Sequence, residues 1–198
     1  GASENIIMAA SLASGESEIN NIAIEPEVID LIKCLKSMGS EIDFIGDRKI
    51  LIQGKENLRG TTHHVIPDRI EAGTYMIAGA LIGNNLNIQN IEPDHLQNIL
   101  NVFEELEIDF NLNKDSVSLS KSDIEVGVNL QTEEYPGFPT DLQAQIMVLL
   151  SKSKKNSSII ENIFENRFMH VPELNRMGTQ ISIEGNKSII SPSSELIG

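Results

Sequence analysis

Apolar and polar positions follow two periods along the chain, and the change from one period to the other marks successive elements. Apolar residues at helical spacing predict amphipathic helices, and strict alternation predicts strands. Pro26 suits the first turn of a helix and Gly39 suits a helix end, while Gly46-Asp47 suits a turn between two strands. The first elements expected are a helix over 4–13, a strand over 17–23, a helix over 26–38 and a hairpin of 41–44 and 49–53.

The same order of patterns returns further along the chain, so the sequence contains an internal repeat. Glu4 matches Glu71 and Glu25 matches Glu92, with a separation of 67 residues in both cases (71 − 4 and 92 − 25). The second copy predicts a helix over 71–81, a strand over 85–91, a helix opened by 91–94 and strands at 108–110 and 117–119. The third copy predicts a helix over 142–150, a strand over 157–163 and a helix over 165–177. Three helix–strand–helix–hairpin units of an α/β fold are therefore expected, each with its helices on one face of a small sheet.

Composition excludes several classes of function. The 198-residue chain has 40% apolar residues, which suffices for a core, and no apolar run reaches the length of a membrane span. Its formal net charge of −14 argues against nucleic-acid binding, which needs clustered Lys and Arg. The single Cys34 rules out a disulfide framework and a cysteine-cluster metal site. We therefore expect no metal, no cofactor, no membrane partner and, because no signal segment opens the chain, a cytoplasmic location.

One polar stretch stands out before the third repeat, at Phe138-Pro139-Thr140-Asp141. Pro139 fixes its own φ and biases Phe138 toward extended backbone. Thr140 and Asp141 are both favourable N-caps for the apolar segment that follows. From chemistry alone, Asp141 is expected to be a helix cap, because capping aspartates are far commoner than catalytic ones.

The segments 138–145 (FPTDLQAQ) and 163–174 (IFENRFMHVPEL) resemble the UDP-N-acetylglucosamine 1-carboxyvinyltransferases, the enolpyruvyl transferases of peptidoglycan synthesis. Further similarity lies in 1–10 and 67–74, so the resemblance spans nearly the whole chain in family order. It implies a fold in which such units pack with helices inside and sheets outside, an inside-out α/β barrel. Residues 1–66 would be the last unit of the first, substrate-binding domain, and residues 67–198 two units of the second. We expect the chain to be an excised piece of a longer protein.

The family reaction adds the 3′-hydroxyl of UDP-N-acetylglucosamine to C2 of phosphoenolpyruvate and then eliminates phosphate. It needs a base for the hydroxyl, an acid for the methylene carbon and cations for the anionic substrates. By resemblance, Asp141 matches the aspartate assigned as base. The family's acid is a cysteine on a loop upstream of Gly1; Cys34, at helical spacing among apolar residues, is a packed thiol and does not match it.

Four further residues match substrate-binding positions of the family. Ile163 matches a position whose main chain contacts the nucleotide sugar, and Phe164 would either lie beside that sugar or only pack. Arg167 would either hold phosphate or carboxylate through two hydrogen bonds or pair with Glu165 or Asp141. Gly1 directly follows a segment whose backbone touches the nucleotide phosphates.

Other charged positions are interpreted as structural. Arg69 and Glu25 match charged family positions near the cleft, and each is expected to form an ion pair rather than bind substrate. His170, expected on a helix, is interpreted as a hydrogen-bonded structural histidine.

Two alternatives to this function stay open from the sequence. One is an enolpyruvyl transferase acting on shikimate 3-phosphate, which shares the repeat; the other is a non-catalytic repeat module that binds a protein. The isolated chain is expected to be inactive, because the acid and most anion-binding cations would lie elsewhere. Self-association is expected if the interrupted barrel exposes apolar surface.

Overall fold

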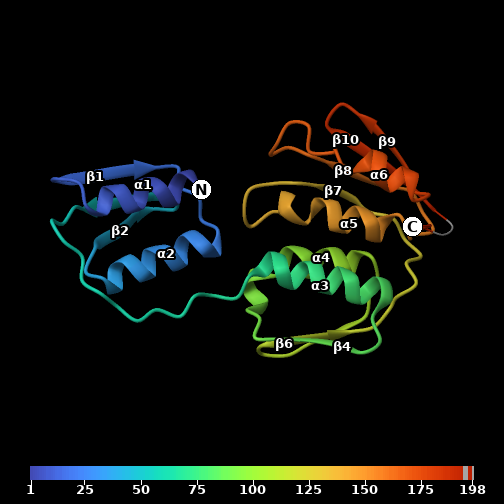
Figure 1. Ribbon diagram of the computed structural model, residues 1–198, viewed down its shortest axis with the longest axis horizontal. Helices are drawn as coiled ribbons and strands as arrows, with labels where there is room; N and C mark the ends of the chain where they lie inside the picture. The colour runs from blue at the N-terminus through green and yellow to red at the C-terminus, as the bar shows by residue number, and fades with distance from the viewer. Residues whose placement is uncertain (194–195, 198) are drawn as a thin grey trace. The chain divides into compact units, whose positions relative to one another are not determined.

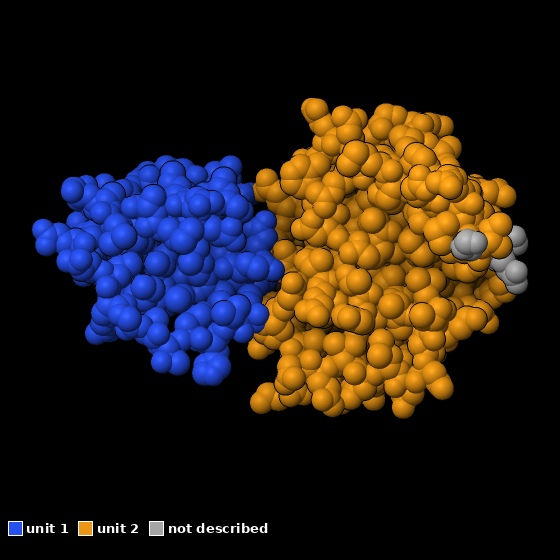
Figure 2. All heavy atoms as spheres, in the orientation of Figure 1, with its two compact units in different colours: residues 1–66 blue, residues 67–198 orange. Residues whose placement is uncertain are grey.

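The computed structural model describes residues 1–193 and 196–197. The described chain divides into two compact units, Gly1–Ile66 and Pro67–Gly198, which are coloured separately in Figure 2. This boundary coincides with the predicted domain crossing, whereas the assignment of the two units to domains of a longer protein stays a prediction.

The first unit is a three-stranded antiparallel sheet covered on one face by two helices. Ile50 and Ile52 of the central strand are fully buried beneath the helices, which contact the sheet and each other. The strand order is β1-β3-β2. The elements are α1 (Ala2–Ser11), β1 (Glu16–Asn20), α2 (Pro26–Ser37), β2 (Glu41–Gly46) and β3 (Lys49–Gln53).

The second unit contains two sheets with helices between them. α3 contacts β4 and β6 on one side, α5 contacts β8 on the other, and α3 and α5 contact each other; Figure 1 shows this layering within the unit. The elements of the first sheet layer are α3 (Arg69–Ile82), β4 (Leu86–Gln89), η1 (Pro93–His95), α4 (Gln97–Glu105), β5 (Phe110–Leu112) and β6 (Ser116–Leu119). Those of the second are β7 (Asn129–Gln131), η2 (Thr140–Leu142), α5 (Gln143–Leu150), β8 (Ser157–Ile160), α6 (Val171–Arg176), β9 (Gln180–Glu184) and β10 (Lys187–Ser191).

Within the described residues, the order helix, strand, helix, strand, strand occurs three times, with 3₁₀ turns and β7 added. The last strand of each set lies in the middle, in the orders β1-β3-β2, β4-β6-β5 and β8-β10-β9, and β7 joins the third sheet parallel to β8. Gly39 and Gly178 follow the second helix of the first and third sets with φ of 102° and 104°. Only glycine adopts this left-handed conformation at little cost, so the predicted helix stop at Gly39 is confirmed.

Two predicted helices begin later than their patterns suggested. Pro93 opens the 3₁₀ turn η1, and the α-helix starts only at Gln97. The helix predicted over 165–177 is reduced to Val171–Arg176, and residues 165–170 form turns. In that turn segment Asn166 has φ of 56°, a left-handed conformation that breaks a right-handed helix. Helical spacing of apolar residues does not report such a break.

Close contact between helices in the second unit depends on a missing side chain. A Cβ atom built on Gly73 of α3 would lie 2.7 Å from Cδ1 of Leu142, at the end of η2. Leu142 is 1% exposed and belongs to the core cluster of this unit. The glycine therefore lets α3 approach the segment that carries Asp141.

Candidate functional site

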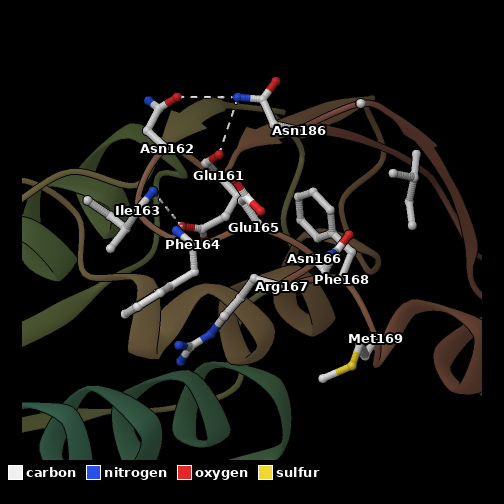
Figure 3. Close-up of a pocket in the computed structure, with 12 residues that line it drawn as sticks. Glu161, Asn162, Ile163, Phe164, Glu165, Asn166, Arg167, Phe168, Met169 and Asn186 are labelled. Carbon is white, nitrogen blue, oxygen red and sulfur yellow. Dashed lines mark hydrogen bonds between the residues drawn. The ribbon is translucent and has the colours of Figure 1, made fainter.

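The loop between β8 and α6 forms an open pocket of about 850 Å³ together with the turn between β9 and β10. Figure 3 shows the side chains that line it, including Ile163, Phe164 and Arg167 of the predicted site. Asp141 lies beside this loop, because its carboxylate is hydrogen-bonded to Arg167. The second unit thus brings together four of the five predicted site residues.

The start of α5 differs from its prediction. Within the part of the chain that the structure describes, neither Thr140 nor Asp141 caps α5 through its side chain, so both predicted caps are wrong. The chain enters through η2 instead, where the N–H groups of Leu142 and Gln143 donate to the carbonyls of Pro139 and Thr140. A 3₁₀ turn satisfies first-turn donors without a cap. Both polar side chains are therefore available for tertiary contacts.

Of the two carboxylates considered as structural partners, Arg167 pairs with Asp141; its role in holding phosphate or carboxylate stays a prediction. Its Nη2 donates to Oδ1 of Asp141 at 2.7 Å, and its guanidinium carbon lies 5.0 Å from the centre of the Phe164 ring. The side chains of Asp141 and Arg167 are 60% and 37% exposed. An exposed pair of this kind contributes little to stability, about 0–1 kcal/mol. Both groups remain accessible to a ligand.

Ile163 and Phe164 are held by their backbone rather than by their side chains. Their N–H groups donate to Oε1 of Glu161 at 2.9 and 3.1 Å. The Phe164 side chain is 53% exposed, and Arg167 lies over its ring. Phe164 therefore lies outside the buried core, and the two alternatives, contact with the sugar or packing alone, stay predictions.

Glu161 was missed by the sequence analysis. It follows β8 directly and is only 3% exposed, an unusual burial for a carboxylate. Burial by itself raises the pKa of this carboxyl, but hydrogen bonds from Thr132, Thr140 and the backbone of Ile163 and Phe164 outweigh it and lower the pKa below its usual value. The available signal was a charged residue inside the strand predicted over 157–163.

His170 lies just before α6, at its N-cap position, rather than inside a helix. Burial, followed by the nearby Arg167, lowers its pKa. Its Nε2 is buried and meets no hydrogen-bond partner among the described residues, contrary to the hydrogen bond predicted there. A neutral imidazole beside Arg167 leaves the guanidinium as the local positive charge.

Of the remaining predicted residues, Gly1 lies in the first unit, at the start of α1. Cys34 lies in α2 and is half-buried rather than fully packed. Arg69 lies over the ring of Tyr135, 5.4 Å from its centre, which is a cation–π contact.

In the described part of the chain no three His, Cys, Asp or Glu side chains are grouped to hold a metal ion. No helix among the described residues has the length and apolarity to span a bilayer.

Comparison with known proteins places this geometry in a family. The chain is 49% identical over 190 residues to the UDP-N-acetylglucosamine 1-carboxyvinyltransferase of Pelagibacter ubique, covering 96% of this chain and 46% of that protein. It is 47% identical to the protein of the same name from Gluconacetobacter diazotrophicus, with 96% of this chain and 45% of the relative covered. The chain thus spans about half the length of the curated relatives it matches.

A solved structure and a family model agree with these relatives. The enolpyruvyl transferase NikO from Streptomyces tendae superposes with a TM-score of 0.87 at 22% identity, covering 96% of this chain and 46% of that one, and so shares the fold. The model of the EPSP synthase (3-phosphoshikimate 1-carboxyvinyltransferase) family matches residues 1–198. The chain therefore belongs to the EPSP synthase family and has the enolpyruvyl transferase fold.

Proposed function

We propose that this chain is part of a UDP-N-acetylglucosamine 1-carboxyvinyltransferase, which transfers the enolpyruvyl group of phosphoenolpyruvate to the 3′-hydroxyl of UDP-N-acetylglucosamine. The curated relatives at 43–49% identity carry this name. The observation that carries the proposal is the exposed Asp141 carboxylate at the edge of the Ile163–Arg167 loop. The reaction would take place in the cytoplasm, as a step of peptidoglycan synthesis.

Asp141 would act as the base. Its carboxylate would accept the proton of the sugar hydroxyl as the oxygen bonds to C2 of phosphoenolpyruvate, while an acid adds a proton to the methylene carbon. Loss of phosphate from C2 together with a proton from the resulting methyl carbon then restores the double bond. A base needs hydrogen-bond reach to its proton more than a raised pKa. The Arg167 pair supports this role because the hydrogen bond to Oδ1 fixes the position of the carboxylate, while the Asp141 side chain stays 60% exposed to a ligand.

Arg167, Ile163 and Phe164 would bind substrate around this base. The guanidinium of Arg167 offers donors beyond the one used for Asp141, which suits a phosphate or carboxylate. The exposed ring of Phe164 would lie beside the sugar, and the backbone at Ile163 would contact it. Gly1, in the first unit, would lie near the nucleotide phosphates. Residues 1–66 and 67–198 would belong to the first and second domains of the longer protein.

The test is phosphate release from phosphoenolpyruvate in the presence of UDP-N-acetylglucosamine, measured on a protein of the length of the curated relatives. Asp141→Ala is expected to reduce turnover by about 10²–10⁴-fold with nucleotide binding retained. Near-normal turnover of the variant would remove Asp141 from the mechanism. The 198-residue chain alone is expected to show no turnover. Both substrates are anions, and the chain has only 15 Lys and Arg to bind them, against 29 Asp and Glu that repel them.

The family model also carries the name of the 3-phosphoshikimate enzyme, so shikimate 3-phosphate is the second candidate acceptor. The same assay with shikimate 3-phosphate in place of the nucleotide sugar distinguishes the two. Phosphate release with shikimate 3-phosphate as the acceptor, and none with UDP-N-acetylglucosamine, would reverse the proposal.

A further inference from the structure

One buried carboxylate joins the two chain segments that carry the candidate site. Oε2 of Glu161 accepts a hydrogen bond from Thr140 Oγ1 at 2.8 Å, and Thr140 directly precedes Asp141. Oε1 accepts from the backbone N–H groups of Ile163 and Phe164 at 2.9 and 3.1 Å. The two oxygens of one side chain thus hold the turn with the proposed base and the loop with the proposed sugar contacts.

Glu161 is itself fixed from several directions. Thr132 Oγ1 donates to its Oε1 at 2.8 Å and accepts the N–H of Asn162 at 2.9 Å. Its own N–H donates to the Asn186 carbonyl at 2.8 Å, and Asn186 Nδ2 donates to its carbonyl at 3.2 Å. Figure 3 shows the bond from Asn186 Nδ2 to the Glu161 carbonyl as a dashed line. The backbone of Glu161 is therefore anchored to the β9–β10 turn, and its carboxylate is anchored to Thr132, which follows β7.

The same contacts separate Glu161 from a catalytic role. Among the described residues, four donors satisfy its two oxygens, and 3% of the residue is exposed. A carboxylate with its lone pairs engaged by O–H and N–H donors is a poor proton acceptor. Asp141, by contrast, is 60% exposed and has one charged partner.

We propose that Glu161 is a positioning residue, which sets the distance between Asp141 and the Ile163–Phe164 backbone by binding Thr140 and the loop N–H groups at once. This inference rests on the proposed function. A base displaced by about 1 Å can lose about 10²-fold in rate, so a link of this kind affects turnover more than binding. Buried, hydrogen-bonded groups are suited to it because they have no alternative partners in solvent.

The kinetic test uses Thr140 in the full-length protein, because Thr140 contributes a single hydroxyl to the link. Thr140→Val removes the bond to Glu161 at nearly constant volume, and Thr140→Ser keeps it. We expect Thr140→Val to lower kcat about tenfold with KM for the nucleotide sugar within about twofold, and Thr140→Ser to restore kcat. The matched control is Thr179→Val, which removes a hydroxyl bound to Asn175 in the same unit and is expected to leave kcat unchanged.

Equal kcat values for the two valine variants would overturn the proposal. So would a Thr140→Ser variant as slow as Thr140→Val, because the hydroxyl would then not matter.

A second measurement does not depend on activity. Glu161→Gln in the full-length protein replaces two charge-assisted acceptors with one neutral carbonyl, and hydrogen exchange at the amides of Ile163 and Phe164 is expected to speed up at least about tenfold. Unchanged exchange at both amides contradicts the positioning role even if enolpyruvyl transfer is confirmed. Faster exchange without any enolpyruvyl transfer supports the link and rejects the proposed reaction.

Discussion

The first helices of successive repeats, α3 and α5, begin in different ways although each has an aspartate at its start. Asp68 caps α3, with Oδ1 accepting from the N–H groups of Ile70 and Glu71 at 2.8 and 3.1 Å. At α5 the aspartate pairs with Arg167 instead, and the preceding threonine donates to Glu161.

The comparison shows what frees a polar side chain from helix capping. The 3₁₀ turn η2 supplies acceptors for the first N–H groups of the α5 segment, and Leu142 is packed in the core against Gly73 of α3. Packing therefore holds the start of α5, whereas a local hydrogen bond holds the start of α3. An aspartate at the start of a helix thus stabilises the helix in one copy and takes a tertiary partner in the next.

The largest effect on stability is expected from Glu161→Ala. It removes the acceptor of four donors, from Thr132, Thr140 and the β8–α6 loop, and we expect the free energy of unfolding to fall by about 2–4 kcal/mol. Urea unfolding followed by circular dichroism measures the change. A loss below about 1 kcal/mol would mean that water replaces the carboxylate and that tertiary bonds do not hold this region.

Acid pH tests the same carboxylate without a large deletion. The pKa of Glu161 is lower in the folded chain than in the unfolded one, so its contribution is present above the unfolded pKa and lost as pH falls through the folded pKa. As the pH falls from 7 to well below the ordinary glutamate pKa of 4.5, the wild-type chain is expected to lose more stability than Glu161→Gln. Parallel stability curves for the two proteins would show that this group does not titrate differently on folding.

The contact between the two helix starts is tested by Gly73→Ala. The new Cβ would lie 2.7 Å from Cδ1 of Leu142, so Leu142 must shift. Such overpacking costs about 1–3 kcal/mol of stability, and the higher helix propensity of alanine offsets about 1 kcal/mol of that cost. We expect a net loss of about 1 kcal/mol, measured by thermal unfolding, with lower turnover in the full-length protein. Gly60→Ala is the control, since its Cβ would meet no described atom within 4 Å. A stabilised Gly73→Ala variant would rule out a tight contact.

The smallest effects compare the two aspartates directly. Asp68→Ala is expected to cost about 1 kcal/mol of stability through loss of the cap, and Asp141→Ala less than about 0.5 kcal/mol, because its ion pair is exposed. Urea unfolding of both variants under the same conditions gives the difference. Equal costs would show that Asp141 also serves the helix.

The periodic patterns predicted most of the elements, and the reason is local. The alternation in β3 (Lys49–Gln53) and the Pro26 and Gly39 limits of α2 depend on neighbouring residues, and the structure confirms them. The predictions that were wrong depended on distant groups. Thr140 is a good cap by propensity, but a carboxylate 21 residues away binds its hydroxyl instead. The shortened α6 is an exception, because its cause is local: a left-handed turn at Asn166.

By itself, the sequence determined the repeat, the α/β class, the family resemblance and the identity of Asp141, Ile163, Phe164 and Arg167 as candidate residues. Only the tertiary structure decided which partner each polar group takes. Arg167 had two carboxylates within reach by sequence and pairs with Asp141, and Glu161 gained its role when its burial beside Thr132 and Thr140 left it no solvent. Propensity acts between neighbours along the chain, whereas a buried carboxylate takes whichever donors the fold brings to it.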